Sequence, residues 1–220
     1  MIRVLSEWTW GALLPLRCSG CGTAFAGPAA LRLCGLCASA LPDLRGPVGE
    51  LLCAERLFVP WARVGLRLRA APEVRRLVHT FKYGGDGALA VEAGRWLAAG
   101  LPPDLGDPDL VPIPVHLRRR LHRGYNQAER IAAGIHEAWH WPLEPRGLVR
   151  TAHRASITGA GRRHRAETLR SCFVPGRGLR GRSVVLVDDV LTTGATVRAA
   201  AEAVEAGGGR VVGLAVLVLS

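Results

Sequence analysis

Hydrophobic and polar positions divide the C-terminal part of the chain into a strand, a helix and a second strand. Residues 184–187 are consecutive aliphatic residues, a run typical of a short strand buried on both faces. From Val197 to Val204 apolar residues recur three or four positions apart, which predicts an amphipathic helix. The glycines at 207–209 end this helix, and residues 211–219 predict the next buried strand.

The middle of the chain continues this alternation. Strands are predicted over residues 57–59 and 64–68 (a hairpin) and 110–113, and helices over residues 72–81, 88–101 and 126–141. Pro112 and Pro114 should end the third strand early, because proline donates no hydrogen bond to a central ladder. Asn126 and Glu129 form a predicted capping box at the start of the last helix. The alternation of strands and helices along the chain predicts an α/β fold with an open, mostly parallel sheet and a ligand at the carboxyl ends of its strands.

Polar side chains gather where the strand over residues 184–187 ends. Asp188 and Asp189 follow it directly, and a turn rich in hydroxyl groups leads into the helix. That turn reads Thr192, Thr193, Gly194, Ala195 and Thr196. Backbone N–H groups at the start of a helix, aided by the helix dipole, bind phosphate. Carboxylates just before the turn can accept hydrogen bonds from sugar hydroxyls. The alternative is an ordinary acidic turn with threonine caps. The chain contains no P-loop sequence.

Four cysteines near the N-terminus form two C-x-x-C pairs, Cys18 with Cys21 and Cys34 with Cys37. This spacing predicts a tetrahedral Zn²⁺ site that is structural, because four thiolates leave no open coordination position. Disulfides or redox motifs are the alternative. The remaining cysteines, Cys53 and Cys172, are interpreted as small apolar residues.

Length and composition suggest one α/β domain with a small appendage. The 220 residues allow a core of roughly 150 residues and a minor module. The predicted division is a zinc-binding module over 1–45, a linker over 46–56 and the α/β domain over 57–220. No apolar run approaches the roughly 18 residues of a membrane span, and the N-terminus lacks a signal-peptide core. We therefore expect a cytoplasmic protein without membrane insertion.

The formal net charge is +11, and Lys82 is the only lysine among the many basic residues. Such an excess of positive charge attracts polyanions, so both phosphorylated substrates and nucleic acids are compatible with the composition. A basic loop, residues 118–123, has three open interpretations: it closes over a pyrophosphate, it binds DNA, or it is a solvated run of charge.

The turn after residues 184–187 resembles the ribose- and phosphate-binding signature of type I phosphoribosyltransferases, which bind phosphoribosyl pyrophosphate (PRPP). The cysteine pairs, the sequence F-K-Y-G from residue 81, V-P-I-P from residue 111, R-G-Y-N-Q from residue 123 and the acidic signature occur in an order similar to that of the ComF family. These competence proteins combine a zinc module with a phosphoribosyltransferase domain. The resemblance covers nearly the whole chain.

The resemblance implies roles for individual residues. Asp188 and Asp189 would hold the ribose hydroxyls, and the turn over residues 192–196 would hold the 5′-phosphate. Lys82 and, in the first interpretation of the basic loop, Arg123 would contact the pyrophosphate, which Mg²⁺ would neutralise, although Lys82 also suits an ordinary helix C-terminus. Lys82 and the two aspartates are the candidate catalytic residues.

Family membership further implies support of natural competence through the handling of imported single-stranded DNA, with DNA-processing proteins as partners. It leaves the acceptor substrate open. Three functions therefore remain: a phosphoribosyltransferase, a non-catalytic nucleotide-sensing protein, and an adaptor that binds single-stranded DNA.

Overall fold

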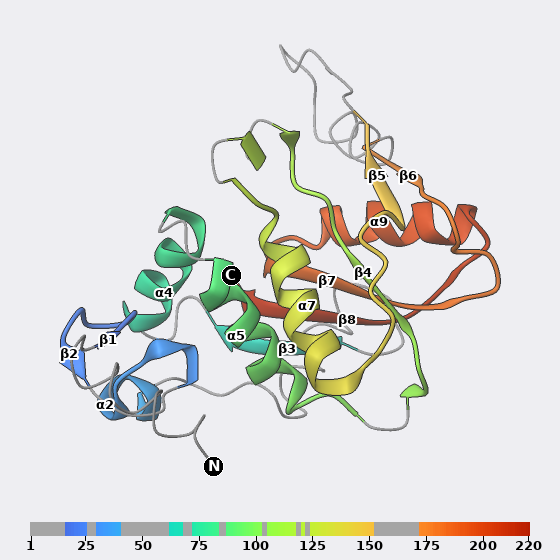
Figure 1. Ribbon diagram of the computed structural model, residues 1–220. Coiled ribbons are helices and arrows are strands. Elements are labelled where there is room, and N and C mark those ends of the chain that lie inside the picture. The colour runs from blue at the N-terminus through green and yellow to red at the C-terminus, as the bar shows by residue number, and fades with distance from the viewer. Residues whose placement is uncertain are drawn as a thin grey trace, which may run out of the picture.

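The computed structural model of the protein describes residues 16–25, 30–40, 62–67, 72–83, 87–102, 105–117, 120–121, 124–151 and 172–220. Its centre is a four-stranded sheet in the order β3-β8-β7-β4 (Figure 1). The strands are β3 (Ala62–Arg67), β4 (Asp109–Pro112), β7 (Ser183–Leu191) and β8 (Arg210–Leu219). All three pairings are parallel, which confirms the predicted fold class.

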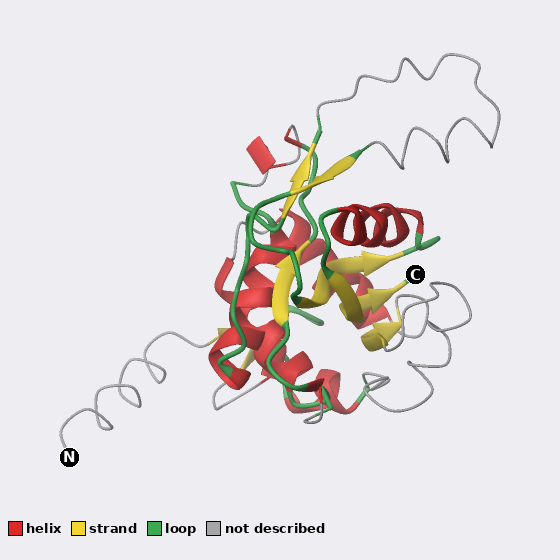
Figure 2. Cartoon of the chain, turned by 90° about the vertical axis from the view of Figure 1, so that its right-hand side faces the viewer, coloured by secondary structure: helices red, strands yellow, loops and turns green. Residues whose placement is uncertain are grey.

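Helices cover both faces of the sheet (Figures 1 and 2). On one face lie α5 (Gly87–Ala98) and α7 (Gln127–Trp139), whose buried residues share a core with Val185 and Val187 of β7. On the other lies α9 (Ala195–Ala206), which shares a second core with Val184 and Leu186. The uninterrupted aliphatic run of β7 is thus explained, because successive side chains enter different cores.

Two expectations about strands need correction. The segment predicted as the second arm of a hairpin is β3, and it pairs in parallel with β8, while residues 57–59 lie outside the described part. The strand predicted to end before the acidic pair instead continues as β7 to Leu191. The reason is that β8 runs beside it throughout, with Asp188 opposite Val216 and Leu191 opposite Leu219.

β4 stops earlier than its neighbours, as its prolines predict. It pairs with β7 only as far as Pro112 opposite Val187, after which the Ile113 N–H donates to the Val187 carbonyl. β4 lies at the edge of the sheet, so Pro112 leaves no donor missing from a central ladder. Among the described strands, the end of β7 that carries the acidic pair is therefore flanked by β8 alone.

The predicted cap of α7 is present in altered form. The Asn126 side chain accepts a hydrogen bond from the Ala128 N–H at 3.2 Å. Its amide donates to Glu129 at 3.4 Å, so Glu129 contacts the cap side chain and not the backbone N–H of a reciprocal capping box. The same amide donates to the Ile113 carbonyl at 3.2 Å, which joins the start of α7 to the end of β4.

The cysteine region packs directly on the α/β core. It comprises β1 (Leu16–Arg17), β2 (Ala24–Phe25), the 3-10 turn η1 (Ala30–Arg32) and α2 (Gly35–Ser39). Leu31 and Leu33 belong to the same buried cluster as Leu77 and Leu89. Leu77 lies on α4 (Pro72–Tyr83), which matches the predicted helix over residues 72–81.

A second small sheet stands apart from the main one. It consists of β5 (Leu148–Arg150) and β6 (Phe173–Pro175), which pair antiparallel. The basic and weakly apolar sequence of residues 150–170 predicts a loop or short lid between them, and residues 152–171 lie outside the described part. None of the described helices has the length and apolar character needed to cross a bilayer.

The crossing of α5 and α7 depends on two glycines and gives a first testable prediction. A Cβ added to Gly134 would overlap the Val91 carbonyl oxygen and lie 2.9 Å from the Gly94 Cα. Gly134→Ala must push the helices apart, so we expect it to lower the free energy of unfolding by about 1–3 kcal/mol. Urea denaturation measures this, with Gly35→Ala as the control because a Cβ there meets nothing within 4 Å. Equal losses in both variants would contradict the tight crossing.

Candidate functional site

The turn between β7 and α9 forms one half of the candidate site. Gly194 stands at the N-cap of α9 with φ of 76°, a left-handed conformation that glycine adopts without strain. Thr192 and Thr193 are exposed, and the Thr193 hydroxyl accepts a hydrogen bond from the Ala195 N–H at 3.5 Å. Because the first N–H groups of a helix have no intrahelical acceptor, this turn can bind an anion.

The acidic pair forms the other half. Asp188 is only 9% exposed, Asp189 is half-buried, and the Asp189 N–H donates to an Asp188 carboxylate oxygen at 2.9 Å. Burial raises the pKa of Asp188 well above its ordinary value, and the neighbouring Asp189 carboxylate raises it further. The Asp189 N–H and the charge of Arg150 act in the opposite direction. Asp188 is therefore a desolvated acceptor that gains from hydrogen-bond donors such as sugar hydroxyls.

Arg150 is a site residue that the sequence interpretation missed. It donates to the Pro114 carbonyl at 3.2 Å, and its guanidinium lies 5.1 Å from the centre of the Phe173 ring. It is also the cation whose charge lowers the pKa of Asp188. Arg150 is one arginine among many, and only the β5–β6 pairing brings it toward the acidic pair, so no local pattern could reveal it.

The other predicted site residues are described only in part. Lys82 lies in the last turn of α4, where the structure describes the backbone but not the side chain. Arg123 and most of the basic loop lie outside the described residues. Arg120, from the same loop, is exposed and pairs with Glu129 near the start of α7 at 3.8 Å.

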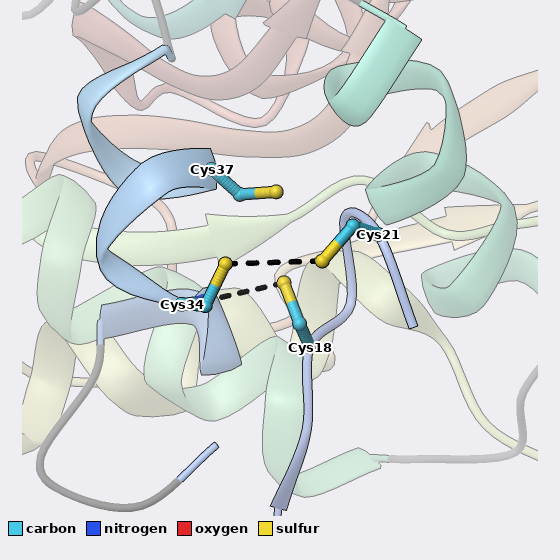
Figure 3. A group of neighbouring side chains, drawn as sticks. All are labelled: Cys18, Cys21, Cys34 and Cys37. Atoms are coloured by element: carbon cyan, nitrogen blue, oxygen red, sulfur yellow. Dashed lines mark hydrogen bonds between the residues drawn. The ribbon is translucent and has the colours of Figure 1, made fainter. Parts of the chain in front are cut away.

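The four cysteines converge as their spacing predicts. Figure 3 shows their sulfurs facing one another, and all four lie within 4.8 Å of each other. The Cys18 sulfur accepts hydrogen bonds from the N–H groups of Cys34 at 3.2 Å and Gly20 at 3.4 Å. The Cys21 and Cys34 sulfurs are 3.8 Å apart. All the described cysteines are free thiols.

Local polar groups prepare this cluster for a metal. Burial opposes ionisation of Cys18, yet the N–H groups of Cys34, Cys21 and Gly20 outweigh it and lower its pKa to about 6. Burial and the neighbouring thiols raise the pKa of Cys37. Gly22, with φ of 78°, makes the turn after the first pair. Four converging thiols with N–H···S contacts fit a thiophilic ion such as zinc.

Comparisons with known proteins bear on the first of these features, the turn between β7 and α9. The phosphoribosyl transferase domain family matches residues 160–220, which include β7, α9 and β8. The chain is 30% identical over 144 residues to DNA utilization protein YhgH of Escherichia coli strain K12, a match covering 63% of each chain. The Salmonella typhimurium protein of the same name is 29% identical over 203 residues, or 86% of each chain.

A third relative is the bifunctional protein PyrR of Streptomyces coelicolor, 39% identical over 97 residues. That match covers 44% of this chain and 48% of PyrR. The match to the Escherichia coli relative spans somewhat less than two thirds of that protein's length.

Proposed function

We infer that this chain, which belongs to the ComF family of proteins with a phosphoribosyltransferase domain, binds PRPP or a nucleoside monophosphate at the carboxyl end of β7. The observation that carries this proposal is the close succession of an acidic pair, of which Asp188 is buried, and an exposed threonine turn with a left-handed glycine. The acidic pair accepts hydrogen bonds and the threonine turn donates them, so together they suit a ribose 5-phosphate.

In this proposal each part of the chain has one task. Asp188 and Asp189 accept hydrogen bonds from the ribose 2′- and 3′-hydroxyls. The turn over residues 192–196 binds the 5′-phosphate through N–H and hydroxyl groups, and Lys82 and Arg123 are the proposed cations at the pyrophosphate. Arg150, held by Pro114 and Phe173, balances the charge of the acidic pair. Mg²⁺, when bound with PRPP, neutralises the pyrophosphate.

The reaction that follows from this arrangement is pentosyl transfer. An acceptor displaces pyrophosphate at the anomeric carbon through a loose, cation-like transition state. The protein contributes by positioning and by charge stabilisation, since little covalent chemistry is required of it.

Release of pyrophosphate separates an enzyme from a nucleotide-sensing protein. Incubation with PRPP, Mg²⁺ and a series of nitrogenous acceptors should release pyrophosphate, and omission of Mg²⁺ should suppress this release. An Asp188→Asn/Asp189→Asn variant should release only the background amount, because its ribose acceptors are weakened. Saturable PRPP binding without release over the series would instead support the non-catalytic alternative.

We further propose that the cysteine cluster holds one structural Zn²⁺ through Cys18, Cys21, Cys34 and Cys37. Four thiolates saturate a tetrahedral ion, so the metal takes no part in the reaction. Its task is to stabilise a module that is too small to fold on its own core.

A link to DNA is the second part of the proposed function. The relatives are named DNA utilization proteins, and the net charge of +11 favours polyanions. We propose that the protein supports natural competence in the cytoplasm, where it handles imported single-stranded DNA directly or with DNA-processing proteins. An adaptor that binds DNA without any transfer reaction is the alternative.

A further inference from the structure

Arg150 is joined to the carboxyl end of β4, beside the proposed ribose site. Its side chain donates to the Pro114 carbonyl at 3.2 Å. The preceding residue, Ile113, donates its N–H to the Val187 carbonyl at 2.9 Å, and Val187 directly precedes the acidic pair. A continuous path of hydrogen bonds and backbone therefore runs from β5 to Asp188.

A second contact fixes the Arg150 side chain from the other side. Its guanidinium lies over the ring of Phe173, an arrangement in which the face of the ring attracts the cation. Phe173 is the cross-strand neighbour of Arg150 in the β5–β6 pair and is only 4% exposed, so its ring is itself fixed by the core. Arg150 is half-buried, and solvent therefore screens its charge less than that of a surface arginine.

The position of this cation leaves the acidic pair free for a ligand. Within the described residues no hydrogen bond or ion pair joins Arg150 to Asp188, although the charge of Arg150 lowers the pKa of that carboxyl. The Asp189 carboxylate raises it, and Val216, opposite Asp188 on β8, carries no charge. A salt bridge would occupy the carboxylate oxygens, whereas a cation held nearby favours the ionised form and leaves those oxygens to accept other hydrogen bonds.

We propose that Arg150 is a positioning residue of the ribose site, which fixes the end of β4 against β7 and keeps the acidic pair in the form that accepts sugar hydroxyls. It acts through Asp188 and the Pro114 carbonyl, and so differs from Lys82 and Arg123, the proposed cations at the pyrophosphate. The inference rests on the proposed PRPP site and adds a proton-linked control to it. Binding of PRPP weakens when Asp188 is protonated, and Arg150 sets the pH at which this happens.

The first measurement needs no ligand. Carbon-13 NMR follows the titration of the Asp188 carboxyl in the full chain, and the signal is identified by its absence from Asp188→Asn. In Arg150→Gln this carboxyl should titrate at higher pH than in the wild type, because a favourable charge is lost. Arg150→Lys should restore most of the wild-type behaviour, since it keeps the charge. Arg177→Gln, at an exposed position, is the matched control and should leave the titration unchanged.

The second measurement is the affinity for PRPP with Mg²⁺ over a range of pH. The ratio between variant and wild type at each pH cancels the titration of PRPP itself. Arg150→Gln should bind PRPP about tenfold more weakly than the wild type in acid, where ionisation of Asp188 limits binding. The difference should shrink as the pH rises, because Asp188 then becomes ionised in both proteins. Arg150→Lys should stay close to the wild type throughout.

The outcomes separate this inference from the proposed function. Circular dichroism and metal content equal to those of the wild type show that the variants are folded. A loss of affinity that is the same at every pH, or equal in Arg150→Gln and Arg150→Lys, would indicate a merely structural contact and overturn the inference. A wild-type titration of Asp188 in Arg150→Gln would also overturn it and leave the PRPP site intact. A wild type that binds no PRPP would overturn the proposed function, and the role of Arg150 with it.

Discussion

Replacing Asp188 by asparagine is expected to raise the melting temperature of the ligand-free protein while weakening its binding of PRPP. Burial and the Asp189 carboxylate raise the pKa of Asp188, so the folded protein holds this proton more tightly than the unfolded chain does. Ionisation of Asp188 therefore costs stability as the pH rises above the unfolded value of about 3.9. Asparagine has nearly the same shape and no charge, and it removes this cost.

Thermal denaturation at several pH values measures the first effect. The wild type should lose stability relative to Asp188→Asn as the pH rises through the unfolded pKa, and the difference should be smallest in acid. Asp107→Asn, at an exposed position, is the control. For PRPP, loss of a charged acceptor should weaken binding about ten- to a hundredfold. A variant that is less stable than the wild type at neutral pH would contradict the electrostatic account.

Removal of the metal is the second large effect that we expect. Structural zinc sites contribute about 10–16 kcal/mol of binding free energy in small zinc modules, more than any other single interaction here. Chelation or Cys37→Ser should unfold the cysteine region and expose Leu31 and Leu33, which pack with α4 and α5. Hydrogen exchange over residues 16–40 should then become fast, while β7 and β8 keep their protection.

Elemental analysis and a matched variant check the same claim. Purified protein should contain about one zinc per chain, since four thiolates complete one tetrahedral site. Cys172→Ser, on a partly buried cysteine outside the cluster, should retain the metal and the protection of residues 16–40. A metal-free protein in which residues 16–40 remain fully protected from hydrogen exchange would contradict a stabilising role for zinc.

The sequence predicted well those features that local pattern controls. The consecutive aliphatic residues of β7, the periodicity of α9 and the glycines after it determine a β-α-β unit within a short stretch of chain. The cysteine spacing similarly predicted a convergence that depends on two tight turns.

Features that depend on distant neighbours were missed. β7 continues through Asp188 because β8 runs beside it. β3 pairs with β8 although most of the chain lies between these two strands in the sequence. Arg150 lies on β5, far from Asp188 in the sequence, and its charge nevertheless lowers the pKa of that residue. The Arg76 side chain of α4 donates to the Gly20 carbonyl of the cysteine region, a contact that no periodicity encodes. In each case tertiary contacts between remote segments supply the information.

Isothermal titration with PRPP and Mg²⁺, comparing the wild type with Asp188→Asn/Asp189→Asn, tests the central claim most directly. We expect saturable binding at one site per chain in the wild type and a loss of at least about tenfold in affinity in the variant, because both ribose acceptors are changed. Circular dichroism would verify that the variant remains folded. Equal affinity in the two proteins, or no binding by the wild type, would contradict a PRPP site at the end of β7.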